Sequence, residues 1–239
     1  MRLELMMRHV GIEKLKENFY SIEQGRVRSY MFVGLDRILL VDTGFPDSDI
    51  LDQVKKVANL PIEVIFTHAD WDHTGESGPI KNKYIHPAEM DYYKQNNDGN
   101  MPLLPVWEGD KIEIGGYVLE VVHLPGHTPG SIGLIERKQR FMLTGDCIKN
   151  GPIFMYGYGR NFQAFHASMI KLKAMSHEVD IFYACHKDRE MKTDIVDDLI
   201  VGSQKIINKE LSGQELQKDQ EIIYRYEYGK ASFYLDEIL

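Results

Sequence analysis

Apolar residues along the chain recur mostly in short runs or in alternation, which predicts a molecule rich in strands. Gly, Pro or charged residues bound most of these runs and indicate turns between them. In the segment Glu221–Tyr228, Ile222 and the three tyrosines would share one side; such a strand suits a core, a pocket wall or a homodimer contact. The expected strands are Tyr30–Leu35, Ile38–Val41, Ile62–Phe66, Lys111–Ile114, Tyr117–Leu124, Ser131–Ile135, Arg140–Leu143, Asp180–Ala184, Glu221–Tyr228 and Ala231–Leu235.

Helical spacing of apolar residues occurs between these strands. The first such segment carries apolar residues from Ile50 to Ala58, and Asp47 or Ser48 would cap it. The order of elements contains no regular βαβ repeat, so we expect an α+β molecule in which helices cover sheets. The other expected helices are Pro87–Asn96, Phe162–Ser176 and Thr193–Lys209.

Composition narrows the class of protein. The 239 residues are 43% hydrophobic, and 28 basic against 36 acidic residues give a net charge of −8, which argues against nucleic acid as a partner. We expect one domain over residues 1–239, with a C-terminal helix and hairpin extension at about 193–239. No apolar leader or membrane span is visible, and Cys147 and Cys185 cannot form a disulfide framework. We therefore expect a cytoplasmic protein with no membrane partner and with buried thiols.

A cluster of candidate metal ligands follows the strand Ile62–Phe66. His68, Asp70, Asp72 and His73 fall within six residues, and imidazole and carboxylate groups suit zinc, iron or manganese. A solvated acidic loop is the alternative for this segment taken alone.

Three further candidate ligands follow other expected strands. His127 lies in the turn Leu124–Ser131, Asp146 follows Arg140–Leu143, and His186 follows Asp180–Ala184. Four strand ends that carry such residues make a chance arrangement a poor explanation, and we expect one metal site.

The order of these residues resembles the metallo-β-lactamase superfamily. The resemblance runs from Tyr30 to His186 and includes Asp42 in the segment Val41–Gly44. It implies a four-layer αββα sandwich with a binuclear metal centre. By position, His68, Asp70 and His127 would bind the first metal and Asp72, His73 and His186 the second. Asp146 would bridge both, and Asp42 would steady the ligand loop.

One position departs from the usual family pattern His-x-His-x-Asp-His. Asp70 replaces the second histidine, and the extra negative charge would make the site harder and its metal a poorer Lewis acid. Flavodiiron proteins also carry an acidic residue here. We expect two divalent ions, zinc first, with iron or manganese as alternatives.

The resemblance implies a metal-dependent hydrolase that uses a metal-bound hydroxide on a small-molecule substrate. Asp146 stands where many true β-lactamases have cysteine, which favours an ester, thioester, lactone or phosphodiester over a β-lactam. Asp72 would orient the water or take its proton. The alternatives are a diiron redox protein without a flavodoxin domain and a ligand-binding sensor that retains the fold.

Some residues near this site are candidates for substrate contact. The glycines of residues 151–160 predict a mobile loop, in which Tyr156 or Tyr158 could donate a hydrogen bond to an oxyanion. A plain surface loop explains them equally well. His166 is a further candidate, whereas we expect His86 to begin a helix and His123 to pack in a strand.

Overall fold

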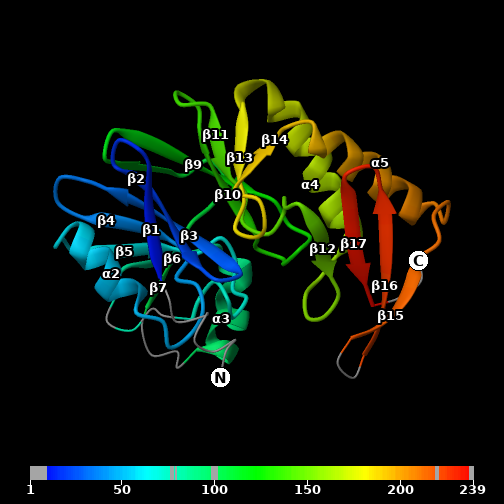
Figure 1. The fold of residues 1–239 in the computed structure, drawn as a ribbon, viewed down its shortest axis with the longest axis horizontal. Helices are drawn as coiled ribbons and strands as arrows, with labels where there is room; N and C mark the ends of the chain where they lie inside the picture. The colour runs from blue at the N-terminus through cyan, green and yellow to red at the C-terminus, as the bar shows by residue number, and fades with distance from the viewer. Residues whose placement is uncertain (1–9, 76–77, 79, 98–101, 219–220, 237–239) are drawn as a thin grey trace. The chain divides into compact units, whose positions relative to one another are not determined.

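The computed structural model describes residues 10–75, 78, 80–97, 102–218 and 221–236 (Figure 1). The chain divides into two compact units, a first unit (Met1–Val122) and a second unit (His123–Leu239). Residues 1–9, part of the stretch in which no leader was expected, lie outside the described residues. None of the described helices has the length and apolar character needed to cross a membrane.

A seven-stranded sheet forms the main layer of the first unit, with its strands in chain order. Pairing is antiparallel from β1 to β4 and parallel from β4 to β7. Parallel neighbours need crossover connections, and the stretch between β5 and β6 that carries the predicted ligands is one of them. The strands are β1 (Gly11–Lys16), β2 (Phe19–Gln24), β3 (Val27–Val33), β4 (Ile38–Val41), β5 (Ile62–Ile65), β6 (Lys83–Ile85) and β7 (Leu103–Pro105).

Helices α2 (Ile50–Val57) and α3 (Met90–Asn96) pack on one face of this sheet (Figure 1). Their buried side chains form one cluster with alternate residues of the central strands, for example Ile38 and Leu40 of β4. The intervening residue Leu39 is also fully buried. Both faces of β4 are therefore covered, as its unbroken apolar run suggests.

A hairpin of β8 (Lys111–Ile114) and β9 (Tyr117–His123) packs against β2 and β3. The Tyr117 ring lies 5.1 Å from Phe32 and 6.0 Å from Phe19, centroid to centroid. The Tyr117 hydroxyl donates to the Glu17 carbonyl at 2.6 Å. These aromatic contacts hold the hairpin against β2 and β3, because edge-on ring pairs stabilise a fold beyond the burial of their apolar surface.

The second unit contains two groups of strands. In the first group β11 pairs antiparallel with β10 and parallel with β13, and β14 pairs antiparallel with β13. The second group is a four-stranded sheet in the order β12-β17-β16-β15. The strands are β10 (Ile132–Glu136), β11 (Phe141–Leu143), β12 (Gly151–Met155), β13 (Ile181–Tyr183), β14 (Glu190–Lys192), β15 (Gln214–Lys218), β16 (Glu221–Tyr228) and β17 (Ala231–Leu235).

Two helices pack within the second unit, α4 (Phe162–Met175) and α5 (Ile195–Ile207). The Asn161 side chain caps α4 by accepting from the Ala164 amide at 2.8 Å. Helix α5 packs on α4 and on β16 and β17 (Figure 1). Helices that cover sheets in both units agree with the predicted α+β class.

Most predicted elements are confirmed, including the helix that His86 begins by accepting from the Ala88 amide. Two details are wrong. Asp49, and not Asp47 or Ser48, is the N-cap residue of α2. Residues 151–155 form strand β12 in place of the expected mobile loop, because they pair in parallel with β17. The register of β16 is unbroken, so Ile222 and the three tyrosines do share one side of the strand, on which Tyr226 is buried and Ile222 is exposed.

Candidate functional site

The first group of predicted ligands lies in the crossover that follows β5. His68 Nε2 is 3.4 Å from Asp70 Oδ2, and His73 Nε2 is 4.0 Å from Asp72 Oδ1. The two imidazole rings lie 4.1 Å apart, centroid to centroid. We call His68, Asp70, Asp72 and His73 the loop cluster. Within the first unit it brings two nitrogen donors and two carboxylates to one place.

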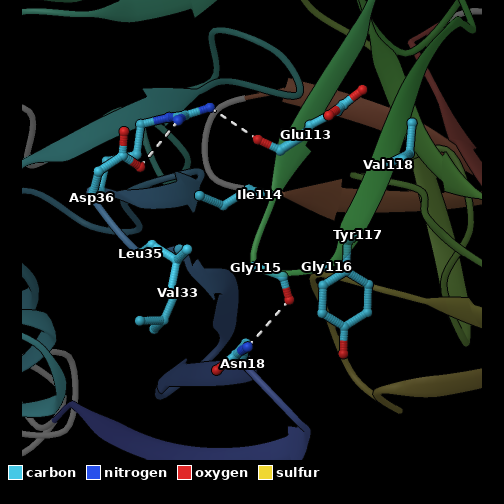
Figure 2. Close-up of a pocket in the computed structure, with 12 residues that line it drawn as sticks. Asn18, Val33, Leu35, Asp36, Glu113, Ile114, Gly115, Gly116, Tyr117 and Val118 are labelled. Atoms are coloured by element: carbon cyan, nitrogen blue, oxygen red, sulfur yellow. Dashed lines mark hydrogen bonds and ion pairs between the residues drawn. The ribbon is translucent and has the colours of Figure 1, made fainter.

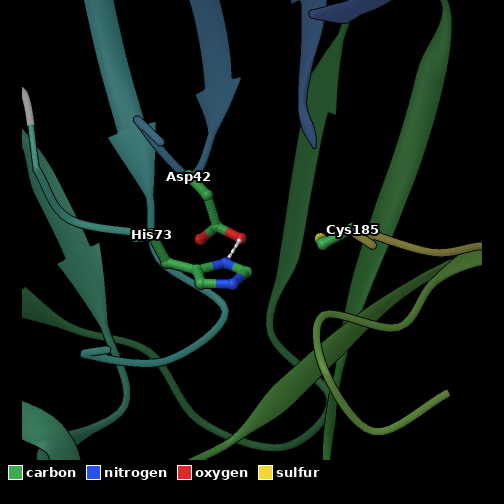
Figure 3. A group of neighbouring side chains, drawn as sticks. All are labelled: Asp42, His73 and Cys185. Atoms are coloured by element: carbon green, nitrogen blue, oxygen red, sulfur yellow. Dashed lines mark hydrogen bonds and ion pairs between the residues drawn. The ribbon is translucent and has the colours of Figure 1, made fainter. Parts of the chain in front are cut away.

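Asp42 supports the loop cluster from the end of β4. Its Oδ1 accepts from the Thr67 amide at 2.7 Å, and its Oδ2 accepts from the Thr67 hydroxyl at 2.7 Å. His73 Nδ1 lies 2.8 Å from the same Oδ2 (Figure 3). A carboxylate facing Nδ1 holds the proton there and leaves Nε2 as the lone-pair nitrogen. Asp42 has φ 61°, a left-handed conformation that aspartate tolerates better than most residues.

His68 is oriented through the same network. Its Nδ1 lies 3.0 Å from the Thr67 hydroxyl oxygen. Because that hydroxyl donates its only hydrogen to Asp42, its oxygen accepts from His68 Nδ1. The lone pair of His68 is therefore on Nε2, which faces Asp70. This tautomer follows from the hydrogen-bond network.

Glu89 is a supporting residue that sequence reasoning missed. It is fully buried, and its Oε2 accepts from the Ala69 amide at 2.8 Å, between two members of the loop cluster. Glu89 ends a short 3₁₀ turn, Pro87–Glu89. A first-turn glutamate is common in helices, so the sequence carries no mark of this contact 20 residues away.

The second group of predicted ligands lies in the second unit. His127 Nε2 is 3.8 Å from Asp146 Oδ2, and His186 Nε2 is 3.2 Å from Asp146 Oδ1. We call His127, Asp146 and His186 the strand-end cluster, because the last two follow β11 and β13 and His127 lies in the turn before β10. Asp146 is thus the common neighbour of both histidines.

The turn that carries His127 depends on Gly126. This glycine has φ 139°, and a Cβ atom there would lie 2.4 Å from the Phe165 backbone. Only glycine fits this close approach of the turn to α4. His127 Nδ1 donates to the Phe154 carbonyl of β12 at 2.8 Å, which again leaves Nε2 as the lone-pair nitrogen.

Lys149 contacts the strand-end cluster and was not predicted. Its Nζ lies 2.9 Å from Asp146 Oδ2, and both side chains are only 5% exposed. The ammonium also lies 4.2 Å from the centre of the Phe154 ring, a cation–π contact. The ion pair and the ring compensate the burial of this lysine.

The two cysteines are buried, as predicted. Burial raises the pKa of the Cys147 thiol far above its ordinary value, and the neighbouring Asp146 carboxylate adds to this effect. A thiol in such surroundings is inert, because the thiolate is the reactive form.

The three candidate substrate contacts lie in the second unit. Tyr156 hydrogen-bonds through its hydroxyl to the Lys218 ammonium. Tyr158 is exposed. His166 lies on α4, and its Nδ1 is 2.8 Å from the Ser203 hydroxyl of α5. The His166 contact joins two helices.

A hollow of about 590 Å³ also occurs in the first unit, between the β3–β4 turn and the β8–β9 turn (Figure 2). Fully exposed Leu35 borders this hollow. Arg37 and Glu113 also line it, and the Arg37 side chain donates to the Glu113 carbonyl at 2.9 Å. None of the loop-cluster residues lines it. The loop cluster is therefore separate from this hollow.

Histidine and carboxylate donors at strand ends of a mixed α/β fold define a candidate metalloprotein. Residues 22–186, well over half of the chain, match the metallo-beta-lactamase superfamily. The chain belongs to this superfamily.

Several curated proteins are similar to this chain at low sequence identity. The chain is 26% identical over 145 residues to a probable metallo-hydrolase, YqgX, of Bacillus subtilis, covering 54% of this chain and 69% of the relative. It is 27% identical over 180 residues to an acyl-coenzyme A thioesterase, MBLAC2, of Gallus gallus (60% and 65%). It is 26% identical over 163 residues to the hydroxyacylglutathione hydrolase GloC of Haemophilus influenzae (59% and 76%). The chain spans roughly two thirds of the length of these relatives.

Solved structures confirm the predicted fold. A metallo-beta-lactamase from Pontibacter korlensis superposes with a TM-score of 0.71 at 14% identity, covering 82% of this chain and 99% of that chain. TTHA1623 in a di-iron-bound form superposes with a TM-score of 0.60 at 22% identity (71% and 91%). At these identities the likeness concerns the fold.

Proposed function

We propose that the loop cluster and the strand-end cluster together form one binuclear metal centre. The observation that carries this proposal is the orientation of the buried histidines. His68, His73 and His127 each use Nδ1 for a hydrogen bond within the protein and each turn Nε2 toward a carboxylate. Histidines that ligate metals show this arrangement, because the bond at Nδ1 fixes both the ring and the tautomer.

The donor set suits divalent ions. Four imidazoles and three carboxylates are nitrogen and oxygen ligands, which zinc, iron and manganese all accept. In this assignment His68, Asp70 and His127 hold one ion, Asp72, His73 and His186 hold the other, and Asp146 bridges them. Asp70 gives the first site an extra negative charge, so iron and manganese are candidates beside zinc. The two units would then act as one αββα domain.

The proposed activity is hydrolysis of a small ester, thioester, lactone or phosphodiester. Ions bound here would supply Lewis acidity, which allows water to react near neutral pH. Asp72 is partly exposed and would orient the attacking water and accept its proton. A thioester is the first substrate class to test, because two relatives are named as thioesterase and as hydroxyacylglutathione hydrolase. The reduced cysteines support a cytoplasmic enzyme.

Asp72→Asn tests this mechanism. We expect turnover of acyl-coenzyme A and acylglutathione thioesters to fall by about 10²–10⁴-fold, the usual contribution of a general base. Metal content by mass spectrometry should stay close to that of the wild type, because six of the seven proposed ligands are intact. Asp91→Asn, an exposed substitution on α3, is the matched control and should leave turnover unchanged.

Full activity of Asp72→Asn would contradict the assigned role. Wild-type protein that binds no zinc, iron or manganese would contradict the metal centre itself. Iron-bound protein that consumes oxygen or a peroxide but hydrolyses none of these substrates would favour the diiron redox alternative, which Asp70 and the di-iron structure keep open.

A further inference from the structure

Three aromatic rings surround the ammonium group of Lys218 in the second unit. Its Nζ lies 4.3 Å from the ring centre of Phe154, 4.9 Å from that of Tyr156 and 5.6 Å from that of Tyr234. It also donates a hydrogen bond to the Tyr156 hydroxyl. We call Phe154, Tyr156 and Tyr234 the aromatic cage. All three distances are within the range at which a ring face attracts a cation.

Strand pairing builds the aromatic cage. Phe154 and Tyr234 are paired residues of β12 and β17, and their rings stack with centroids 5.5 Å apart. Tyr156 follows two residues after Phe154, and its ring lies 5.7 Å from that of Phe154. The rings therefore hold their places without Lys218, which reaches them from the end of β15, two strands away from β17 in the sheet.

The surroundings favour a positive guest. Among the described residues, no carboxylate pairs with Lys218. The Asp236 carboxylate, two residues after Tyr234, accepts at 3.3 Å from the amide of Gly157, the residue after Tyr156. The three rings and Lys218 are partly exposed, so a molecule from solution can reach them. By contrast, Lys205 lies 5.9 Å from the single ring of Tyr228 and pairs with Glu210.

We propose that the aromatic cage is a binding site for a small organic ammonium ligand, and that Lys218 occupies it when the ligand is absent. A quaternary ammonium group is less strongly hydrated than a lysine, so rings compete better for it against water. The tethered lysine competes at a high effective concentration, which weakens binding to the wild type. Exchange of one cation for another keeps the charge at the rings constant.

Phe154 links the aromatic cage to the strand-end cluster. Its carbonyl accepts from His127, and its ring also contacts Lys149, the partner of Asp146. A ligand held in the cage therefore lies against the residue that orients His127. The binding site itself requires neither metal nor turnover.

Titration of choline into wild type and Lys218→Ala by isothermal calorimetry tests the proposal. We expect Lys218→Ala to bind choline about tenfold more tightly than the wild type, because the competing ammonium is gone. The neutral isostere 3,3-dimethylbutanol should bind to neither protein with comparable affinity. Lys205→Ala is the matched control and should behave as the wild type.

A second substitution tests whether the rings themselves bind choline once the lysine is removed. Tyr234→Leu in the Lys218→Ala background should abolish the gain in choline affinity while circular dichroism shows an unchanged fold. If Lys218→Ala does not fold, Lys218→Met takes the place of that variant in every titration, because methionine preserves the apolar stem of the lysine. Equal affinity for choline and the neutral isostere would overturn the proposal, and so would the absence of choline binding by every folded Lys218 variant. The contact of Lys218 with the aromatic cage would then be purely structural. Failure here would leave the hydrolase assays unaffected.

Discussion

The loop cluster and the strand-end cluster contain similar donors but are assembled differently. All four residues of the loop cluster fall within six consecutive residues of one crossover, so local chain geometry brings them together. His127, Asp146 and His186 lie 59 residues apart from first to last (186 − 127), and only the pairing of β10, β11 and β13 makes them neighbours. The loop cluster is therefore a local sequence motif, whereas the strand-end cluster depends on strand pairing between distant segments of the chain.

Their supports also differ in charge. Asp42 and Glu89 hold the loop cluster with carboxylates that accept hydrogen bonds from the chain. The strand-end cluster is held by a backbone carbonyl, that of Phe154, and by the cation Lys149. Substitution of a support should therefore weaken the loop cluster through lost hydrogen bonds and the strand-end cluster through an uncompensated buried charge.

Asp146→Ala should have the largest effect. It removes the common neighbour of both histidines and leaves the buried Lys149 ammonium without its carboxylate, which costs about 3–5 kcal/mol in comparable buried pairs. Urea unfolding measures the loss. The double substitution Asp146→Ala with Lys149→Met should recover much of the stability but none of the metal binding. Equal stability of the single and double variants would show that the buried charge is unimportant.

Asp42→Ala should have a smaller effect on stability and a clear effect on metal binding. Thr67 and His73 lose a shared buried acceptor, and we expect a net loss of about 1–3 kcal/mol, the cost of one unsatisfied buried group, because the donors can turn to other partners. Metal affinity should fall about 10–100-fold, as for other groups that orient ligands. Asp47→Ala is the matched control, since exposed Asp47 has a similar φ of 58°. A comparable loss in both variants would assign the effect to backbone conformation.

Asp180→Asn should have the smallest effect, a loss of stability near neutral pH that disappears in acid. Arg140 holds the Asp180 carboxylate with two contacts of 2.8 Å and lowers its pKa below the ordinary 3.8. Because the folded pKa is the lower one, this pair stabilises the protein above pH 3.8, and the contribution disappears as pH falls through the folded pKa. Urea midpoints between pH 2 and 6 should show a shallower acid decline for the variant. Asp52→Asn, an exposed change on α2, should keep the wild-type decline.

Alternation of apolar residues was sufficient to predict β8, β16 and β17 with their observed bounds. It failed for β1, in which the adjacent residues Glu13 and Lys14 are both exposed and break the alternation, and for β12, whose glycine and proline resemble a loop. Residue type and position at strand ends identified the donors of both clusters. Glu89 and Lys149 could not be found in this way, because their contacts depend on burial and on three-dimensional neighbours.

The pairing of β12 with β17 has a practical consequence for recombinant work. The family match ends at residue 186, and a fragment trimmed to that boundary would lack Ala231–Leu235. Strand β12 would lose its only parallel neighbour among the described strands, and the Phe154 carbonyl that orients His127 would sit on an unsupported segment. We therefore expect a fragment that ends at residue 186 to bind metal poorly even though every proposed ligand is present, and we expect a fragment that extends to Leu235 to bind it better.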